Sequence, residues 1–408
     1  MADLLVRDVR LDGVPTPVDI VMRDGRIDEI AAASAEWDAW VGPVVAGGGH
    51  LALPGLVDGH AHLDKTMWGQ PWRPHSAAPG LAGLIANERE GRRTLPPVAE
   101  RAAGLLEAYS AHGATLIRSH VDVDVDAGLS SIEGVLDAAR QCADRIEVQV
   151  VAFPQSGMLV APGTVDLLDA AIRAGADVVG GIDPGGFDGD AVAHLDAVFA
   201  IADRHGCGVD VHLHDRGSLG RHEVSLIIER TRALGLQGKV MLSHAFCLCD
   251  GDPAVAPIVE QLGELDIGVS TVAPGNVEPL PLDLLETHGV AVCLGQDGIR
   301  DLWSPWGDAD MLARAGLMAW RAGARRDADI ARCVDIATTG GARAIGVTDR
   351  VLEAGGRGDL VLLDVATAAE AAVVHPPRSL VVHRAQVVHT SHTSPVVPAG
   401  PSSQHPQP

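Results

Sequence analysis

The sequence predicts an α/β protein built as a (β/α)8 barrel of the TIM type, together with a small β domain formed by both ends of the chain. Three observations support this prediction. Short apolar segments alternate with Ala-, Leu- and Arg-rich segments of helical period, both ends have the pattern of β-strands, and histidines gather where apolar segments end. Buried parallel strands read as continuous apolar runs, and eight β/α units close a barrel.

Both ends of the chain have the pattern of β-structure. Residues 18–22 and 26–30 flank the dipeptide at 24–25, Asp-Gly, which is typical of a tight hairpin turn. The segments 359–364 and 379–388 have the same apolar, β-branched character. We therefore expect the two ends to pair into one small sheet.

The middle of the chain supplies the barrel. Segments with helical period, such as 165–174, 191–204 and 222–234, separate the expected strands. The eight expected strands are residues 51–58, 114–121, 146–153, 176–182, 208–213, 239–244, 267–272 and 290–296.

These patterns divide the chain into three parts. We expect residues 1–50 and 347–392 to form the small domain and residues 51–346 to form the barrel. Residues 393–408 contain five prolines and no charged side chain, so they cannot bury enough apolar surface to offset the entropy of ordering. This tail is predicted to be disordered.

Composition excludes several classes of function. The 408 residues contain 31 Lys+Arg against 54 Asp+Glu, a net charge of −23, which disfavours binding to a nucleic-acid backbone. No uncharged apolar run is long enough for a membrane helix, and the charged N-terminal segment does not resemble a signal peptide. The six cysteines lack zinc-site spacing and are expected to be reduced. The sequence therefore predicts a cytoplasmic protein.

Histidines stand where a barrel enzyme places its chemistry, at the C-terminal ends of the strands. Six of the 18 histidines are there, namely His60, His62, His120, His212, His214 and His244. His60 and His62 are two residues apart on one strand, so both side chains point to the same face. His212 adds an imidazole from across the barrel, and Asp297, after the last strand, adds a carboxylate.

Three nitrogen ligands and one oxygen ligand suit one divalent ion, with Zn²⁺ as the first choice and Fe²⁺ or Mn²⁺ as alternatives. Such an ion lowers the pKa of a water molecule toward about 7. Asp297 could then serve both as ligand and as base for that water. His244 is placed to shuttle a proton or to polarise a substrate.

Several motifs together resemble a known family. They are residues 53–64 (LPGLVDGHAHLD), 119–123 (SHVDV), 151–155 (VAFPQ), 211–212 (VH), 243–244 (SH) and 295–297 (GQD). Over residues 1 to about 390 the chain resembles the amidohydrolase superfamily and, within it, the group of cytosine deaminases and N-isopropylammelide isopropylaminohydrolases.

The resemblance implies a distorted (β/α)8 barrel, a composite β-sandwich from both termini and one catalytic divalent metal. It assigns the metal to His60, His62, His212 and Asp297. It also makes His244 a catalytic acid or base and Gln155 a contact for a substrate amide. The fourth strand does not end in a lysine, so the two-metal variant with a carbamylated lysine is not expected.

The chain departs from the cytosine deaminase pattern at three positions. Asp215 stands where those enzymes carry a glutamate proton shuttle, and it follows a second histidine, so either Asp215 or His214 could carry the proton. Gly298 stands where they carry an aspartate that contacts the pyrimidine. Lys65 stands where they have no cation, and it either contacts an anionic or carbonyl-rich ring or pairs with a nearby acid.

Aromatic residues are scarce, at 3% of the chain, yet four of the seven tryptophans follow the first and last expected strands. Trp68 and Trp72 follow the first strand, and Trp303 and Trp306 follow the last. They could form walls for a planar ring or simply pack their loops. Arg300 is a further candidate for substrate contact. His120 and Asp122 are expected to orient the metal ligands.

These observations predict a metal-dependent deaminase that removes an amino or alkylamino group from a small oxo-pyrimidine, purine or triazine by means of metal-activated water. A ring-opening cyclic amidase or imidase on the same metal site is the alternative, and a binding protein that has lost catalysis is a third reading. The expected partner is a small heterocycle, without nucleic acid or membrane. From the family resemblance we also expect the protein to form a homo-oligomer.

Overall fold

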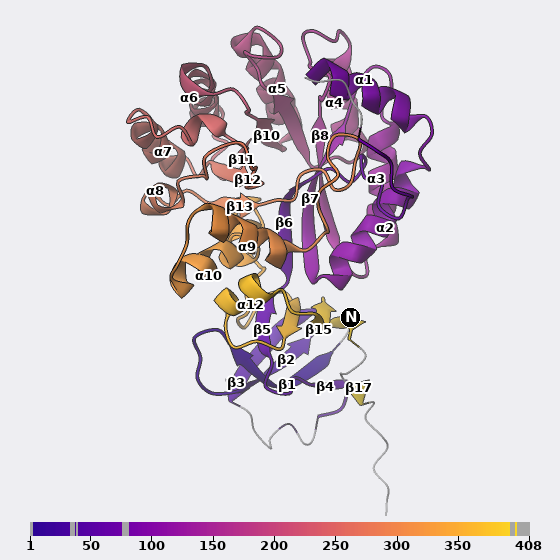
Figure 1. Cartoon of the computed structure of the whole chain (residues 1–408), viewed down its shortest axis with the longest axis vertical. Coiled ribbons are helices and arrows are strands. Elements are labelled where there is room, and N and C mark those ends of the chain that lie inside the picture. The colour runs from indigo at the N-terminus through magenta and orange to yellow at the C-terminus, as the bar shows by residue number, and fades with distance from the viewer. Residues whose placement is uncertain (1–2, 33–36, 38–39, 76–80, 392–395, 398–408) are drawn as a thin grey trace, which may run out of the picture.

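The computed structural model describes residues 3–32, 37, 40–75, 81–391 and 396–397. Figure 1 shows a barrel ringed by helices and, beneath it, a smaller sheet that brings the N-terminal and C-terminal strands together.

Eight parallel strands form the barrel in sequence order. They are β6 (Leu56–Ala61), β7 (Ala114–Asp122), β8 (Glu147–Phe153), β9 (Val178–Ile182), β10 (Gly208–His212), β11 (Val240–Ser243), β12 (Gly268–Thr271) and β13 (Val292–Leu294). The ends of the sheet meet where the Asp297 N–H donates to the His60 carbonyl at 2.8 Å. The predicted barrel is confirmed, and each expected strand has its counterpart.

Helices cover the outside of the barrel (Figure 1). They are α1 (Leu81–Arg92), α2 (Val98–Ala111), α3 (Ser130–Gln141), α4 (Thr164–Ala174), α5 (Ala191–His205), α6 (Gly217–Leu234), the short 3-10 helix η2 (Phe246–Leu248), α7 (Val255–Glu264), α8 (Leu282–Thr287), α9 (Met311–Arg321), α10 (Asp327–Asp335) and α11 (Thr339–Ala344). The three helical segments singled out in the sequence correspond to α4, α5 and α6, although α6 begins earlier, at Gly217.

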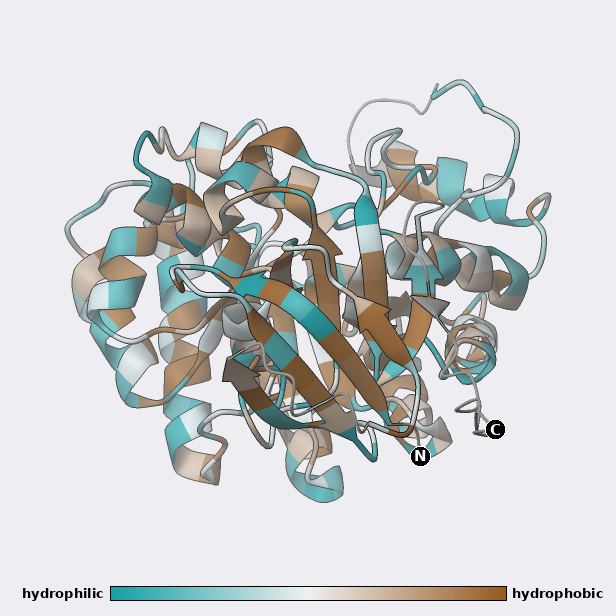
Figure 2. Ribbon diagram, turned by 90° about the horizontal axis from the view of Figure 1, so that it is seen from below, coloured by the Kyte–Doolittle hydropathy of each residue, from teal (hydrophilic) through white to brown (hydrophobic). Residues whose placement is uncertain are grey.

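The second sheet is mixed and draws strands from both ends of the chain. They are β1 (Leu4–Leu11), β2 (Val18–Arg23), β3 (Arg26–Ala32), β4 (Val44–Ala46), β5 (Leu51–Pro54), β14 (Leu360–Leu363), β15 (Arg378–His383), β16 (Gln386–Thr390) and β17 (Val396–Val397), and α12 (Ala368–Val374) lies between β14 and β15. The expected β2–β3 hairpin forms, with Asp24 and Gly25 both at positive φ. Figure 2 shows that the strands of this sheet are largely apolar.

The apolar segment 51–58 serves both sheets rather than the barrel alone. β5 pairs with β1 and β14 of the small sheet, whereas β6 begins the barrel. Gly55 separates the two strands, and a Cβ at this position would collide with the side chain of Thr115. The small sheet therefore extends past the boundary expected at residue 50.

Buried ion pairs and hydrogen bonds join the small sheet to the barrel. Arg378 of β15 donates to the Asp310 carboxylate, which also caps α9, and to the His112 carbonyl at 2.8 Å. Arg350 pairs with Asp359 and donates to Thr115 Oγ1 at 3.0 Å. The base of the barrel is thereby fixed to the small domain.

The structure also bears on the expectations for the C-terminal tail, the cysteines and membrane helices. The tail at 393–408 lies outside the described residues except for Val396–Val397, which pair with β4. The six cysteines are free thiols. None of the described helices is long and apolar enough to cross a membrane.

Candidate active site

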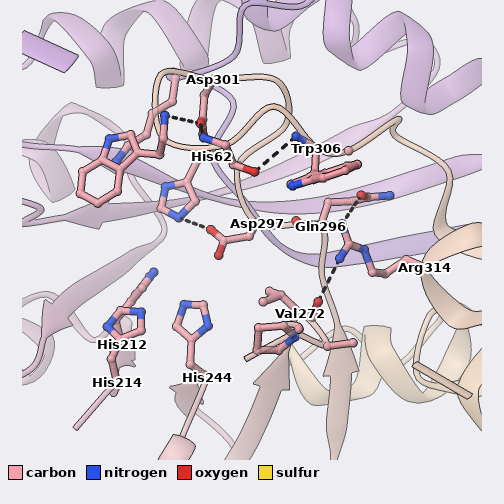
Figure 3. A pocket seen from close by; sticks show the side chains of 18 of the residues that line it. His62, His212, His214, His244, Val272, Gln296, Asp297, Asp301, Trp306 and Arg314 are labelled. Carbon is pink, nitrogen blue, oxygen red and sulfur yellow. Dashed lines mark hydrogen bonds and ion pairs between the residues drawn. The ribbon is translucent and has the colours of Figure 1, made fainter. Parts of the chain in front are cut away.

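A pocket of about 780 Å³ opens at the C-terminal ends of the barrel strands. Side chains at the ends of β6, β8, β9, β10, β11, β12 and β13 line it, as does the long segment between β13 and α9. Figure 3 shows His62, His212, His214, His244 and Asp297 directed toward a common space. This is the end of a barrel at which enzymes place their chemistry.

Three buried imidazoles meet at the floor of this pocket. One ring nitrogen from each of His60, His62 and His212 lies within 4.8 Å of the others. Alternation along β6 sends His60 and His62 to the same side. Nε2 of His60, Nδ1 of His62 and both ring nitrogens of His212 are buried and have no hydrogen-bond partner among the described residues.

The protonation state of these rings fits metal binding. Burial lowers the pKa of His60 to about 3 and that of His212 well below its usual value, so both rings are neutral near pH 7. Neutral imidazole is the form that binds a metal. On its other face, His60 Nδ1 contacts Ser243 Oγ at 3.0 Å, and Ser243 donates to Asp210 at 2.6 Å, which fixes the ring.

Asp297 and His244 complete the cluster from two other strand ends. Asp297 Oδ1 lies 3.2 Å from His62 Nε2 and 3.8 Å from His60 Nε2. One ligand atom from each of His60, His244 and Asp297 also lies within 4.8 Å of the others. Although burial opposes ionisation, the hydrogen bond with His62 holds the pKa of Asp297 well below its usual range. Asp297 is therefore a carboxylate.

Asp58 supports this cluster through hydrogen bonds to the backbone of His60 and of Gln296. Its carboxylate accepts from the His60 N–H at 3.0 Å, from the Gln296 N–H at 3.3 Å and from the hydroxyl of the fully buried Tyr109 at 2.5 Å. It thus ties the strand of His60 to the segment of Asp297. The sequence prediction missed Tyr109, because this residue lies inside α2, away from every strand end.

His214, rather than Asp215, faces the pocket. The His214 ring lies 4.4 Å from the His244 ring between centroids, and its Nδ1 contacts Asp183 Oδ2 at 2.8 Å. Burial opposes protonation of His214, but Asp183 raises its pKa above the usual value. Asp215 is not among the described residues that line the pocket, and its carboxylate accepts the Gly186 N–H at 2.8 Å.

Lys65 lines the pocket and also pairs with nearby acids, so both alternatives that the sequence left open are compatible with its position. Its ammonium lines the pocket and donates to Gln155 Oε1 at 2.6 Å. It also lies 3.2 Å from Asp122 and 3.9 Å from Glu88. Burial opposes its charge, but these carboxylates raise the pKa of Lys65, so it remains a cation. Asp122 is thus an ion-pair partner of Lys65, whereas the sequence had suggested that it orients a predicted ligand histidine.

His120 also differs from its expected role as an orienting partner. Its ring packs 4.2 Å from the His60 ring between centroids, yet neither ring nitrogen has a hydrogen-bond partner among the described residues. Ser243 occupies the orienting position on His60 instead.

The loop residues separate into two groups. Trp303 and Trp306 line the pocket, and Trp303 Nε1–H donates to Glu88. Trp68 and Trp72 do not belong to the described lining, so of the two readings left open by the sequence, walls for a ring fits only Trp303 and Trp306. Arg300 is also absent from that lining, because its guanidinium stacks 4.4 Å from the Trp68 ring centroid.

The sequence prediction missed two pocket residues, Asp301 and Asp183. Asp301 is buried in the loop after β13, where its carboxylate accepts the Trp303 N–H at 2.8 Å. It occupies space that a side chain at Gly298 would need, so an aspartate at 298 does not fit this loop as it stands. Asp183 directly follows β9 and could have been found as a strand-end acid.

The comparisons with known proteins agree with this arrangement. A model of the amidohydrolase family matches residues 44–390. The crystal structure of N-isopropylammelide isopropylaminohydrolase from Burkholderia multivorans is 42% identical, with a TM-score of 0.91 over 95% of this chain and 98% of that chain.

Two further relatives belong to the same group. N-isopropylammelide isopropyl amidohydrolase from Pseudomonas sp. is 28% identical over 95% of this chain and 97% of its own length. The structure of 5-methylcytosine deaminase from Klebsiella pneumoniae with 5-fluorocytosine is 26% identical, with a TM-score of 0.83 over 95% of this chain and 98% of that chain. The resemblance carried by the sequence motifs is confirmed: the chain belongs to the amidohydrolase family and is a hydrolytic enzyme of that family.

Proposed function

We propose that this enzyme is a metal-dependent aminohydrolase that removes an amino or alkylamino group from a small oxo-substituted nitrogen heterocycle. The observation that carries the proposal is the pocket in which unpartnered imidazole nitrogens and the Asp297 carboxylate converge. Two relatives are named for N-isopropylammelide and one for 5-methylcytosine, which supports an amine-bearing heterocycle.

His60, His62, His212 and Asp297 would hold the metal. Their donor set, three neutral imidazoles and one carboxylate, fits Zn²⁺ first and Fe²⁺ or Mn²⁺ as alternatives. A divalent ion held there supplies Lewis acidity that lowers the pKa of a water molecule toward about 7.

Proton transfer falls to the chain's own side chains. Water adds to the ring carbon that bears the amino group, Asp297 takes the proton that the water gives up, and the C–N bond breaks as the amine receives a proton. His214, charged through its contact with Asp183, is the donor for the leaving amine. The neutral His244 ring, 4.4 Å from His214 between centroids, hydrogen-bonds the atom at which charge develops.

The pocket wall formed by Lys65, Gln155 and Trp303 would bind the heterocyclic ring of the substrate. Lys65 and Gln155 present an ammonium and an amide to ring carbonyl oxygens, and Trp303 offers a flat face beside them. Trp306 and Leu317 extend the pocket as an apolar wall, which leaves room for an alkyl substituent on the amine.

A substrate screen with metal analysis tests this proposal. The purified enzyme is incubated with cytosine, 5-methylcytosine, isoguanine, ammelide-type triazines, creatinine and hydantoins, and released amine is measured. We expect amine release from an oxo-pyrimidine or oxo-triazine, and we expect Asp297→Ala to lose both turnover and bound metal. Ring opening without amine release, or full activity in metal-free enzyme, would overturn the proposal.

A further inference from the structure

Two carboxyl groups lie side by side behind the pocket. Glu223, on α6, is fully buried, and Asp215 lies in the loop that follows β10. The two carboxyl groups accept the N–H groups of two consecutive residues, Gly185 and Gly186, and lie within hydrogen-bonding range of each other. Because an ionised carboxylate can only accept, a hydrogen bond between two carboxyl groups requires a proton on one of them.

Complete burial favours Glu223 as the group that carries this proton. Its Oε1 accepts the Gly185 N–H at 2.7 Å, while its Oε2 is buried and no donor reaches it among the described residues. Burial raises the pKa of Glu223, the Asp215 carboxylate raises it further, and the result is about 8. A protonated Oε2 that donates to Asp215 satisfies both groups.

The two carboxyl groups hydrogen-bond to one turn of the backbone. Glu223 accepts a hydrogen bond from the Gly185 N–H, and Asp215 Oδ2 accepts one from the next residue, the Gly186 N–H, at 2.8 Å. A Cβ at Gly185 would lie 2.9 Å from Glu223 Oε1, and a Cβ at Gly186 would collide with the Asp215 carboxylate. The two glycines therefore allow the acids to approach the turn closely.

The same turn begins at Asp183, the residue that orients His214. Asp183 Oδ1 accepts the His214 N–H at 2.6 Å, and Asp183 Oδ2 lies 2.8 Å from His214 Nδ1. The Phe187 N–H donates back to the Asp183 carbonyl at 2.8 Å, which closes the turn. Asp183 thus links the turn to the His214 ring.

We propose that Glu223 is a positioning residue of the active site: as a neutral carboxylic acid it donates to the Asp215 carboxylate and holds the turn at 183–187 that orients His214. This inference rests on the proposed function in that His214 is the residue whose position matters. If Glu223 loses this proton, two carboxylates, Glu223 and Asp215, face each other and the hydrogen bond between them is lost. Their repulsion then weakens the hold on the turn at 183–187. Misplacement by about 1 Å can cost about 100-fold in rate.

The inference predicts an alkaline limit on the reaction. Among the described residues, the titratable groups that face Glu223 are Asp215 in the loop after β10, Asp183 after β9 and Cys247 on η2. Burial raises the pKa of Cys247 to about 12, so this thiol stays neutral over the working range. As the pH passes about 8, Glu223 ionises beside the Asp215 carboxylate, and kcat should fall.

The test compares Glu223→Gln with Glu223→Ala. A glutamine keeps the acceptor for Gly185 and a donor for Asp215 without a titrating proton. We expect Glu223→Gln to stay within about threefold of wild type at pH 7 and to show a smaller fall in kcat above pH 8, since only the fall caused by deprotonation of His214 remains. Glu223→Ala should lower kcat about tenfold or more with little change in KM. Glu229→Gln, an exposed position on the same helix, is the matched control.

A second measurement does not depend on turnover. In histidine-labelled protein, the His214 ring signals are assigned with a His214→Asn variant. In addition to the titration of His214 itself, they should show a change centred near pH 8 in wild type that is absent from Glu223→Gln. If the screen finds no substrate while these signals behave as expected, the proposed function fails and the positioning role stands. Identical signals in both proteins, an unchanged alkaline limb in Glu223→Gln, or equal impairment of Glu223→Gln and Glu223→Ala would overturn the inference.

Discussion

Replacement of Lys65 by methionine removes the cation from a buried cluster of acids and keeps most of the side chain's volume. The ammonium lies 3.2 Å from Asp122 and 3.9 Å from Glu88, and all three side chains are at most 6% exposed. Removing one partner of a buried ion pair costs about 3–5 kcal/mol of the free energy of unfolding, because the remaining charge stays buried without compensation. We expect a decrease in Tm of about 4–6 °C near neutral pH, because the unfolding entropy of a chain of 408 residues is large.

The pH dependence of this loss gives a sharper signature. Burial already raises the pKa of Asp122, and Lys65 is the first charge that opposes this rise, so its removal raises that pKa further. A carboxyl whose pKa is higher in the folded than in the unfolded state stabilises the fold at low pH, and this contribution is lost as the pH rises. The difference in Tm between wild type and Lys65→Met should therefore widen from pH 5 to pH 8.

Thermal unfolding followed by circular dichroism at both pH values is the assay. The chain contains one other lysine, the exposed Lys239, so Lys239→Met is a matched control that should leave Tm within about 1 °C. Lys65→Met combined with Asp122→Asn should recover part of the loss, since both charges are then gone. A Tm decrease of equal size at pH 5 and pH 8, or none at all, would show that the acids are not compensated by Lys65.

Three further predictions concern the pocket and its support. His214→Asn should lower kcat about 100-fold or more, whereas Asp215→Asn should lower it less than tenfold, and steady-state kinetics on the same substrate would show the reverse order if Asp215 carried the proton. Tyr109→Phe leaves the buried Asp58 without its hydroxyl donor and should lower the free energy of unfolding, measured by denaturant titration, by about 1.5–3 kcal/mol. A loss below about 0.5 kcal/mol would be inconsistent with the 2.5 Å hydrogen bond. Trp306→Ala should raise KM for an N-alkyl substrate more than for its unsubstituted analogue, and equal changes would place the alkyl group elsewhere.

Strand-end reasoning predicted the features that depend on regular geometry. The separation of His60 and His62 by two residues puts both rings on one face of β6, and parallel strands bring His212 and Asp297 to the same end of the barrel. The pairing of the two terminal segments into one sheet followed from their apolar, β-branched character. These outcomes need only the periods of strands and helices.

The rest depends on contacts between segments far apart in the sequence. Glu88 reaches Lys65 from α1, and no local pattern marks it as a partner. Asp215 turns toward Gly186 and away from the pocket because the preceding loop offers it a backbone N–H there. The Arg300 guanidinium stacks on the ring of Trp68, which belongs to the loop after the first barrel strand. Sequence spacing carries no information on these directions.

Tyr109 is the single tyrosine of the chain, and this gives the protein an optical property of its own. Burial and the adjacent Asp58 raise the pKa of its phenol well above the usual value. The near-ultraviolet absorbance of tyrosinate in an alkaline titration therefore comes from one site, beneath the strand of His60. The appearance of this band would report, without any label, the pH and the rate at which the interior of the barrel opens to water.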